Sequence, residues 1–248
     1  MVSLLRRGLV AGLLAGVVAG LFYLIAGEPV VQQALRYESA AAGGHAAEVF
    51  SRGTQRVGLL AGVVLYATAM GGVFGFIYAL LESRLDGATA WERSLRLAAA
   101  AFASAWLVPF LKYPANPPGV GDQASGPYRT HMYLVMVAVS LGTGVGAWLL
   151  SRELARRGVP RAPRQLVVGA AYLVVILGAY ALLPEVRLES NLPTALLWDA
   201  RKASAGGQAL LWLSLGVSFG WLSLRAEGAR PRLLWTSRRG REAGGAGR

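Results

Sequence analysis

Six apolar runs alternate with polar segments along this chain of 248 residues. The runs cover residues 8–26, 57–81, 94–111, 132–150, 165–183 and 203–224. An α-helix needs roughly 20 predominantly apolar residues to cross the hydrocarbon core of a membrane, and five of the runs approach or exceed this length. The pattern predicts an all-α fold: a polytopic bundle of six transmembrane helices over residues 1–224, followed by a basic, disordered tail over residues 225–248.

The third run is the shortest, because only residues 97–111 are free of charge. It reaches spanning length if the helix starts near Ser94 and the side chain of Arg96 extends its charged end to the membrane surface. Pro109 is expected to kink or end this helix, because proline lacks the N–H that an α-helix needs.

Composition supports a membrane protein and excludes several other classes. Hydrophobic residues make up 54% of the chain, charged residues only 15%, and there are 32 glycines. Since cysteine is absent, disulfide frameworks and thiolate metal sites are excluded. A net charge of +12 is compatible with nucleic-acid binding, but the arginines lie between the apolar runs and in the tail, where membrane topology signals are expected. We therefore predict no nucleic-acid partner.

The first apolar run also resembles a secretory signal peptide, because Arg6 and Arg7 precede it. The uncharged stretch of residues 8–27 is long for such a peptide, and Leu24 stands where a small residue would be needed for cleavage after Ala26. We predict a retained first helix.

The distribution of lysine and arginine predicts the orientation of the bundle. With six spans and a cytoplasmic N-terminus, the inner segments hold 17 Lys and Arg residues and the outer segments hold 8. If the third run did not cross, the inner total would fall to 10 and the outer total would rise to 15, against the positive-inside rule. We therefore predict that both termini are cytoplasmic and that the bundle lies in an inner (plasma) membrane.

Glycine recurs at every fourth position of the first run. The four residues are Gly8, Gly12, Gly16 and Gly20. On a helix this spacing places them on one face and lets a neighbouring backbone approach closely. The pattern predicts helix packing and carries no information about chemistry.

Residues that could bind a metal ion lie in the predicted outer segments. Residues 27–56 carry Glu28, Glu38, His45 and Glu48, and a short helix is expected from Pro29. Carboxylates and imidazole could collect a divalent cation, although the alternative is a solvated loop with ordinary surface charges. Asp122 and His131 are further candidates, but His131 could instead cap the start of the fourth helix.

The polar segment of residues 112–131, KYPANPPGVGDQASGPYRTH, is the longest proline- and glycine-rich interruption in the chain. Its prolines disfavour both a long helix and a central strand, so we expect a stiff, extended segment with turns at Gly119 and Gly121. It is either a surface loop or a filter at the mouth of a pore, where broken backbone could replace the water of an ion. The filter candidates are Lys112, Tyr113, Pro114, Asn116, Pro117, Pro118, Asp122 and Arg129; Lys112 and Arg129 could instead neutralise Asp122.

The predicted spans contain no Asp, Glu or Lys. Intramembrane ionisable groups usually mark proton relays, so an ordinary proton-coupled exchanger is disfavoured. Membrane-buried hydrolases need carboxylate pairs, a histidine-based triad or a metal centre, and no phosphate loop, HExxH or GxSxG motif occurs. We therefore predict that the chain is not an enzyme and binds no permanent cofactor.

Several segments resemble the CbtA-type probable cobalt transporter subunits. They are GEPVVQQAL at 27–35, SRGTQRVGL at 51–59, VPFLKYPANPPGVGD at 108–122, YRT at 128–130 and LPTALLWDARKASAGGQALLW at 192–212. The resemblance implies a membrane component of cobalt uptake associated with cobalamin synthesis. It also implies a partner, a very small His-bearing membrane subunit of the CbtB type. A richer His/Glu cluster is typical of the family's first outer loop, where this chain keeps only His45 beside Glu38 and Glu48.

Two functions remain open on the sequence. One is a subunit of a permease that moves Co²⁺ or a related divalent cation. The other is a structural or assembly subunit, in which the glycine faces serve only helix packing. With two histidines and no cysteine, oxygen-rich coordination is expected, which suits hard ions better than cobalt.

Overall fold

The structure, a computed structural model, describes residues 1–41, 50–85, 87–118, 120–121, 125–186 and 192–228. Within these ranges the chain is helical apart from short connections, and it contains no strand. Six helices are long and apolar enough to cross a membrane. The prediction of an all-α bundle with six transmembrane helices is therefore confirmed.

The first transmembrane helix is much longer than the apolar run that predicts it. Helix α1 (Val2–Phe22) passes through a π-helical turn, η1 (Tyr23–Gly27), into α2 (Glu28–Ala41). The short helix expected from Pro29 is present as α2, although it begins one residue earlier, at Glu28, and continues directly from the π-turn. Proline within a helix clashes with the carbonyl four residues earlier, here that of Ile25. The wider π-turn just before Pro29 accommodates the ring, so the helix continues.

The third transmembrane helix is continuous in the same way. It consists of α4 (Ala90–Ala101), a π-helical turn η3 (Phe102–Leu107) and α5 (Val108–Lys112). Pro109 again stands one residue beyond a π-turn, and the helix goes on for three more residues before it ends. Together the three parts give 23 residues, which is enough to cross a bilayer.

The remaining helices extend beyond their apolar runs at one or both ends. They are α3 (Arg52–Leu81), which leads into a 3₁₀ turn η2 (Glu82–Arg84), α6 (Gly126–Arg156), α7 (Arg161–Leu182) and α8 (Thr194–Gly228). Two predicted loops were therefore drawn too long. Residues 126–131 form the first turns of α6, with Pro127 in the first turn, where proline is favoured. Residues 194–202 likewise belong to α8.

Helices α1 and α3 pack with their backbones in contact. Gly8, Gly12, Gly16 and Gly20 are all buried on the face of α1 that meets α3, as their spacing predicts. A β-carbon on Gly12 would stand against the carbonyl oxygen of Ala67 and 2.9 Å from the Cα of Gly71. Any larger residue at Gly12 would therefore push the two helices apart.

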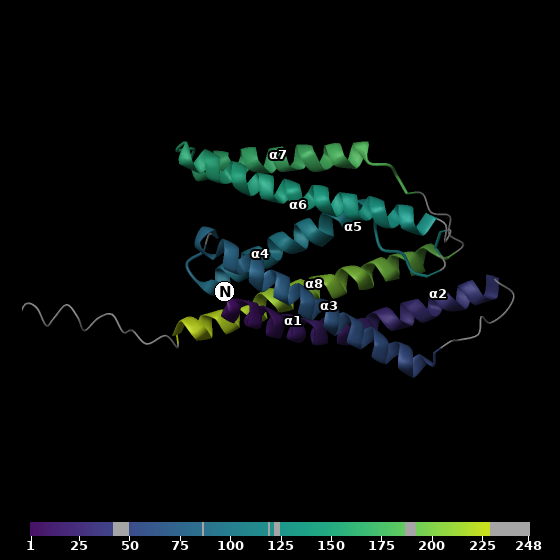
Figure 1. Cartoon of the computed structure of the whole chain (residues 1–248). Helices are drawn as coiled ribbons and strands as arrows, with labels where there is room; N and C mark the ends of the chain where they lie inside the picture. Colours follow the sequence, from purple (N-terminus) through teal and green to yellow (C-terminus); the bar gives the residue numbers. More distant parts are fainter. Residues whose placement is uncertain (42–49, 86, 119, 122–124, 187–191, 229–248) are drawn as a thin grey trace, which may run out of the picture.

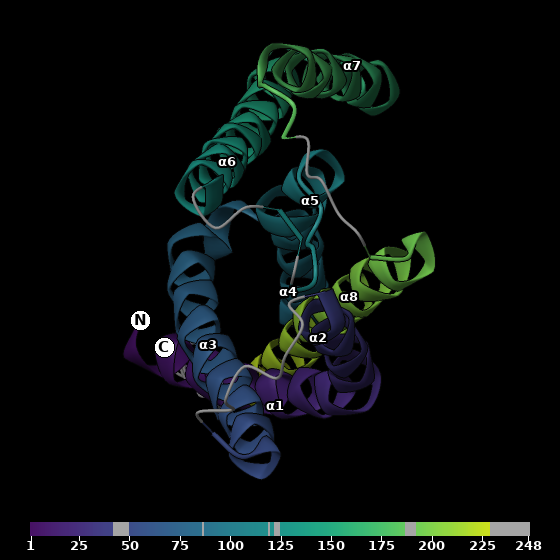
Figure 2. The same ribbon diagram turned by 90° about the vertical axis from the view of Figure 1, so that its right-hand side faces the viewer.

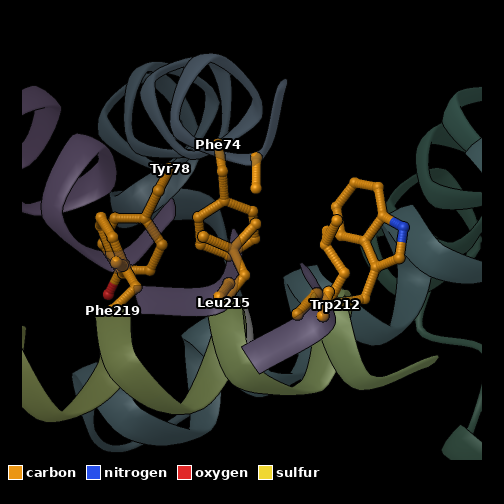
Figure 3. Close-up of a cluster of buried hydrophobic side chains, with 11 residues drawn as sticks. Phe74, Tyr78, Trp212, Leu215 and Phe219 are labelled. Atoms are coloured by element: carbon orange, nitrogen blue, oxygen red, sulfur yellow. The ribbon is translucent and has the colours of Figure 1, made fainter. Parts of the chain in front are cut away.

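The core of the molecule lies where α8 meets α1, α3 and α4. Phe74 and Tyr78 of α3 pack against Phe219 of α8, with ring centroids 5.2 and 4.8 Å apart (Figure 3). Leu215 and Trp212 continue this buried row along α8. Burial on this face holds α8 in the middle of the bundle.

Helix α7 lies at the edge of the molecule and packs chiefly on α6 (Figures 1 and 2). Its large apolar side chains, among them Leu173, Val174 and Leu177, are exposed. A soluble protein does not present such faces to water, whereas lipid covers them at no cost. The chain is thus a multi-pass membrane protein that rests in a lipid bilayer.

Candidate functional site

A cavity of about 610 Å³ lies at the end of the bundle where α5 ends and where α6 and α8 begin (the right-hand end of Figure 1). On the predicted topology this is the outer end. The walls come from helix ends and from the segments that connect them. The residues around it are Trp106, Phe110, Lys112, Tyr113, Pro114, Ala115, Asn116, Val120, Gly126, Arg129, Thr130, Tyr133, Val186, Leu197 and Arg201.

The end of α5 is tied to the end of α7 by hydrogen bonds from side chains to the backbone. The Lys112 ammonium donates to the Tyr180 carbonyl at 2.7 Å, and the Tyr113 hydroxyl donates to the Pro184 carbonyl at 2.8 Å. In return the Tyr180 hydroxyl donates to the Val108 carbonyl. These bonds fix Lys112 and Tyr113 on the wall of the cavity.

The segment after α5 runs along the cavity without regular secondary structure, as its prolines predict. The guanidinium of Arg201, in the second turn of α8, donates from Nη2 to Asn116 Oδ1 at 3.3 Å. Arg129 in α6 donates from Nη1 to the Val120 carbonyl at 3.0 Å. Gly121 has a φ of +78°, a left-handed conformation that favours glycine and turns the chain back toward α6.

The same segment separates this cavity from a smaller one of about 200 Å³. Ala115 and Asn116 contribute to both cavities, whereas Pro117 and Pro118 line only the smaller one. On its other side the smaller cavity is bounded by the π-turn before Pro29 and by α8. Residues 114–118, the PANPP segment, thus form a wall between two cavities at one end of the bundle.

The charged side chains found on the larger cavity in the described part of the chain are all cationic. Lys112, Arg129 and Arg201 line it, and no carboxylate does so in the described part of the chain. Burial raises the pKa of the Tyr113 phenol, with a smaller contribution from Tyr128, so the phenol is neutral near pH 7. Trp106 and Phe110 stack with their ring centroids 4.3 Å apart and give the cavity an aromatic side.

The candidate metal ligands do not come together among the described residues. Glu28 accepts hydrogen bonds from Gln32 at 2.9 Å and from Arg56 at 3.1 Å, so its carboxylate is engaged with its own helix and with α3. Glu38 and His131 are exposed on α2 and α6. No group of three His, Asp or Glu side chains that could hold a metal ion occurs in the ranges that the structure describes. His45, Glu48 and Asp122 lie outside those ranges.

The filter candidates, in contrast, lie on the two cavities. Lys112, Tyr113, Pro114, Asn116 and Arg129 line the larger cavity, while Asn116, Pro117 and Pro118 line the smaller one. The passage of an ion along these residues stays a prediction.

The sequence analysis did not identify Arg201 and Leu197 as site residues. Helix α8 places both on the larger cavity, although they are more than 80 residues beyond Asn116 in the chain. A signal for them was present, since the segment 192–212 is among those that carry the family resemblance.

A family model described as a probable cobalt transporter subunit (CbtA) matches residues 1–223. The chain belongs to this family. The match includes every residue that lines the two cavities. No curated protein and no solved structure matches the chain.

Proposed function

We propose that this CbtA-family chain is the membrane subunit of an uptake permease for cobalt or a related divalent cation, and that it serves cobalamin synthesis. The observation that carries the proposal is the match to a transporter subunit family along residues 1–223, which covers nearly all of the bundle. The ion is cargo here and not a resident cofactor, and the chain performs no enzymatic reaction.

The membrane potential can supply the driving force for such uptake. Moving a charge of 2+ inward across a potential of 100 mV is favourable by about 4.6 kcal/mol. The remaining requirement is a route with ligands that replace the water of the ion. Asn116 and the backbone of the PANPP segment offer oxygen atoms between the two cavities.

A partner subunit is part of this proposal, because the family name describes a subunit. We propose a very small His-bearing membrane protein of the CbtB type. Imidazoles from such a partner would supply the nitrogen ligands that cobalt favours. This chain has only His45 and His131, and His131 is exposed at the start of α6.

The second candidate function is a structural or assembly subunit that does not transport. The close backbone contact between α1 and α3 favours it, because the glycine face serves packing alone. This alternative predicts that changes in the PANPP segment leave cation uptake unchanged.

Uptake of radioactive cobalt tests the proposal in cells that lack other cobalt importers. The arms are this chain alone, the chain with its small partner, and the pair with Asn116→Ala plus Asp122→Ala. Thr194→Ala is the matched control, since Thr194 is exposed at the start of α8 and lines neither cavity. We expect uptake that needs both chains, falls at least about tenfold in the double variant and is unchanged in the control. If no well-expressed combination takes up cobalt, the transport proposal is overturned and the structural or assembly alternative is favoured.

A further inference from the structure

Two side chains on the larger cavity, Lys112 and Arg201, carry a positive charge and form no ion pair in the described part of the chain. Like charges at short range repel, and the loss of bulk water strengthens the repulsion. These two side chains would therefore repel an ion of 2+ and attract an anion.

Lys112 and Arg201 have donors to spare. Lys112 uses one N–H on the Tyr180 carbonyl, and an ammonium has three. Arg201 reaches Asn116 through Nη2, while its buried Nε has no hydrogen-bond partner in the described part of the chain. Neither residue forms an ion pair there. The next residue, Lys202, lies outside the cavity and pairs with Asp199 at 2.8 Å.

We propose that this cavity binds a small organic anion with two or more carboxylates, either free or as the chelate of a divalent metal ion. The planar fork of Arg201 suits a carboxylate, which it can bind through two parallel hydrogen bonds. Lys112 supplies a second positive charge from the end of α5.

Size and surroundings favour a small organic ligand over a single inorganic ion. A volume of about 610 Å³ lies within the range of pockets that hold small molecules. Trp106 and Phe110 offer an apolar surface to a carbon skeleton, and Leu197 and Val186 add to it. A bare chloride or phosphate would leave most of this surface without contact.

The position of the cavity favours a ligand from water over a lipid headgroup. Tyr113–Asn116, Val120 and Val186 belong to connections beyond the helix ends, and Lys112 is the last residue of α5. Arg129 and Arg201 lie in the first two turns of α6 and α8. The walls are thus at the end of the bundle rather than on its lipid-facing sides.

The chelate form of the ligand rests on the proposed transport function, whereas the anion site rests on the cavity alone. Citrate carries three carboxylates, so its one-to-one complex with a divalent cation has a net charge of −1. Such a complex suits a positive cavity, and it brings its own oxygen ligands to a chain that has no cluster of three metal-binding side chains in the described ranges. The substrate of the permease would then be a metal carboxylate complex.

Isothermal titration calorimetry on the purified full chain in detergent tests the site. The probes are citrate, cobalt citrate, cobalt chloride and inorganic phosphate. We expect citrate, cobalt citrate or both to bind, and cobalt chloride and phosphate to bind at least about tenfold more weakly. A hydrogen bond to a charged group is worth about 1.5–3 kcal/mol, so Arg201→Gln and Lys112→Gln should each weaken binding about tenfold or more. Lys202→Gln, the matched control, should change affinity by less than about twofold.

Melting temperatures in the same detergent show whether each variant is folded. If Arg201→Gln does not fold, Arg201→Lys provides the comparison, because it keeps the positive charge but loses the planar guanidinium. This variant should still weaken binding measurably. No binding of either carboxylate probe to the unaltered chain overturns the proposal. The proposal is also overturned if the folded Arg201 and Lys112 variants bind the carboxylate probes as tightly as the unaltered chain does. Displacement of citrate by phosphatidylglycerol vesicles at equal concentration would overturn it as well.

The two proposals can fail separately. Carboxylate binding that is lost in the Arg201 variant, with no cobalt uptake in cells, would leave the anion site standing and overturn transport. Cobalt uptake with no carboxylate binding would overturn the anion site alone. Binding of citrate but not of cobalt citrate would keep the site and exclude the chelate as its ligand.

Discussion

Three serine hydroxyls lie buried between the helices, and in the described part of the chain only one has a hydrogen-bond partner. Ser94 of α4 donates to the Gly216 carbonyl of α8 at 2.7 Å. Ser140 and Ser223 are equally buried, and their hydroxyl oxygens have no partner there. Burying a polar group is favourable only when it is hydrogen-bonded, so these serines should differ in what they contribute to stability.

Replacing Ser94 or Ser140 with alanine tests this difference. Hydrogen bonds between transmembrane helices contribute about 0.6 kcal/mol on average and up to about 1.7 kcal/mol. We expect Ser94→Ala to lower the free energy of unfolding by about 1 kcal/mol. Ser140→Ala should leave it unchanged or raise it, because an unpaired hydroxyl is removed. Unfolding in mixed micelles measures both, and an equal loss in the two variants would contradict the assignment.

At the scale of the helices, two features follow from single residue types. Pro29 and Pro109 each stand one residue beyond a π-turn, so the chain passes through a proline without breaking the helix. Both π-turns lie near the cavities, and Tyr23 and Gly27 of the first one line the smaller cavity. The widened turns therefore help to shape the space at the end of the bundle.

The contact between α1 and α3 depends on glycine at particular positions. Gly12 of α1 faces backbone, with Gly71 Cα 2.9 Å from the place of a β-carbon, whereas Gly62 of α3 has nothing within 4 Å. Gly12→Ala should destabilise the protein by about 1–3 kcal/mol, because the helices must separate. Gly62→Ala should stabilise it by up to about 1 kcal/mol, since alanine is the better helix former. Melting temperatures of the two variants in one detergent give the comparison, and a loss in Gly62→Ala would contradict the packing described here.

For the whole molecule, the sequence predicts the elements better than it predicts the site. Apolar run length predicts the six helices, and the spacing of Gly8, Gly12, Gly16 and Gly20 predicts a packing face, because both patterns are local. The starts of α6 and α8 were not predicted, because Pro127 and Pro193 stand beside them. Proline breaks a helix in its interior but is favoured at its start. Arg201 cannot be placed beside Asn116 from local pattern, since they are 85 residues apart along the chain and helices α6 and α7 lie between them.

The direction of the bundle in the membrane decides which side the larger cavity serves. The distribution of Lys and Arg predicts that the cavity faces outward, provided that residues 90–112 cross the membrane. As a helix of 23 residues, about 1.5 Å per residue, this segment is roughly 35 Å long, against a hydrocarbon core of about 30 Å. We therefore expect it to cross.

Single cysteines introduced by mutation report this topology without interference, because the chain has no cysteine of its own. Thr194→Cys, Arg157→Cys and Ser83→Cys place a thiol at three exposed positions. A membrane-impermeant maleimide added to intact cells should label Thr194→Cys alone, and the other two should react only after permeabilisation. If residues 90–112 did not cross, Arg157→Cys would be labelled and Thr194→Cys protected. Labelling of Ser83→Cys would instead mean that the whole bundle is inverted, and the cavity would then serve ligands from the cytoplasm.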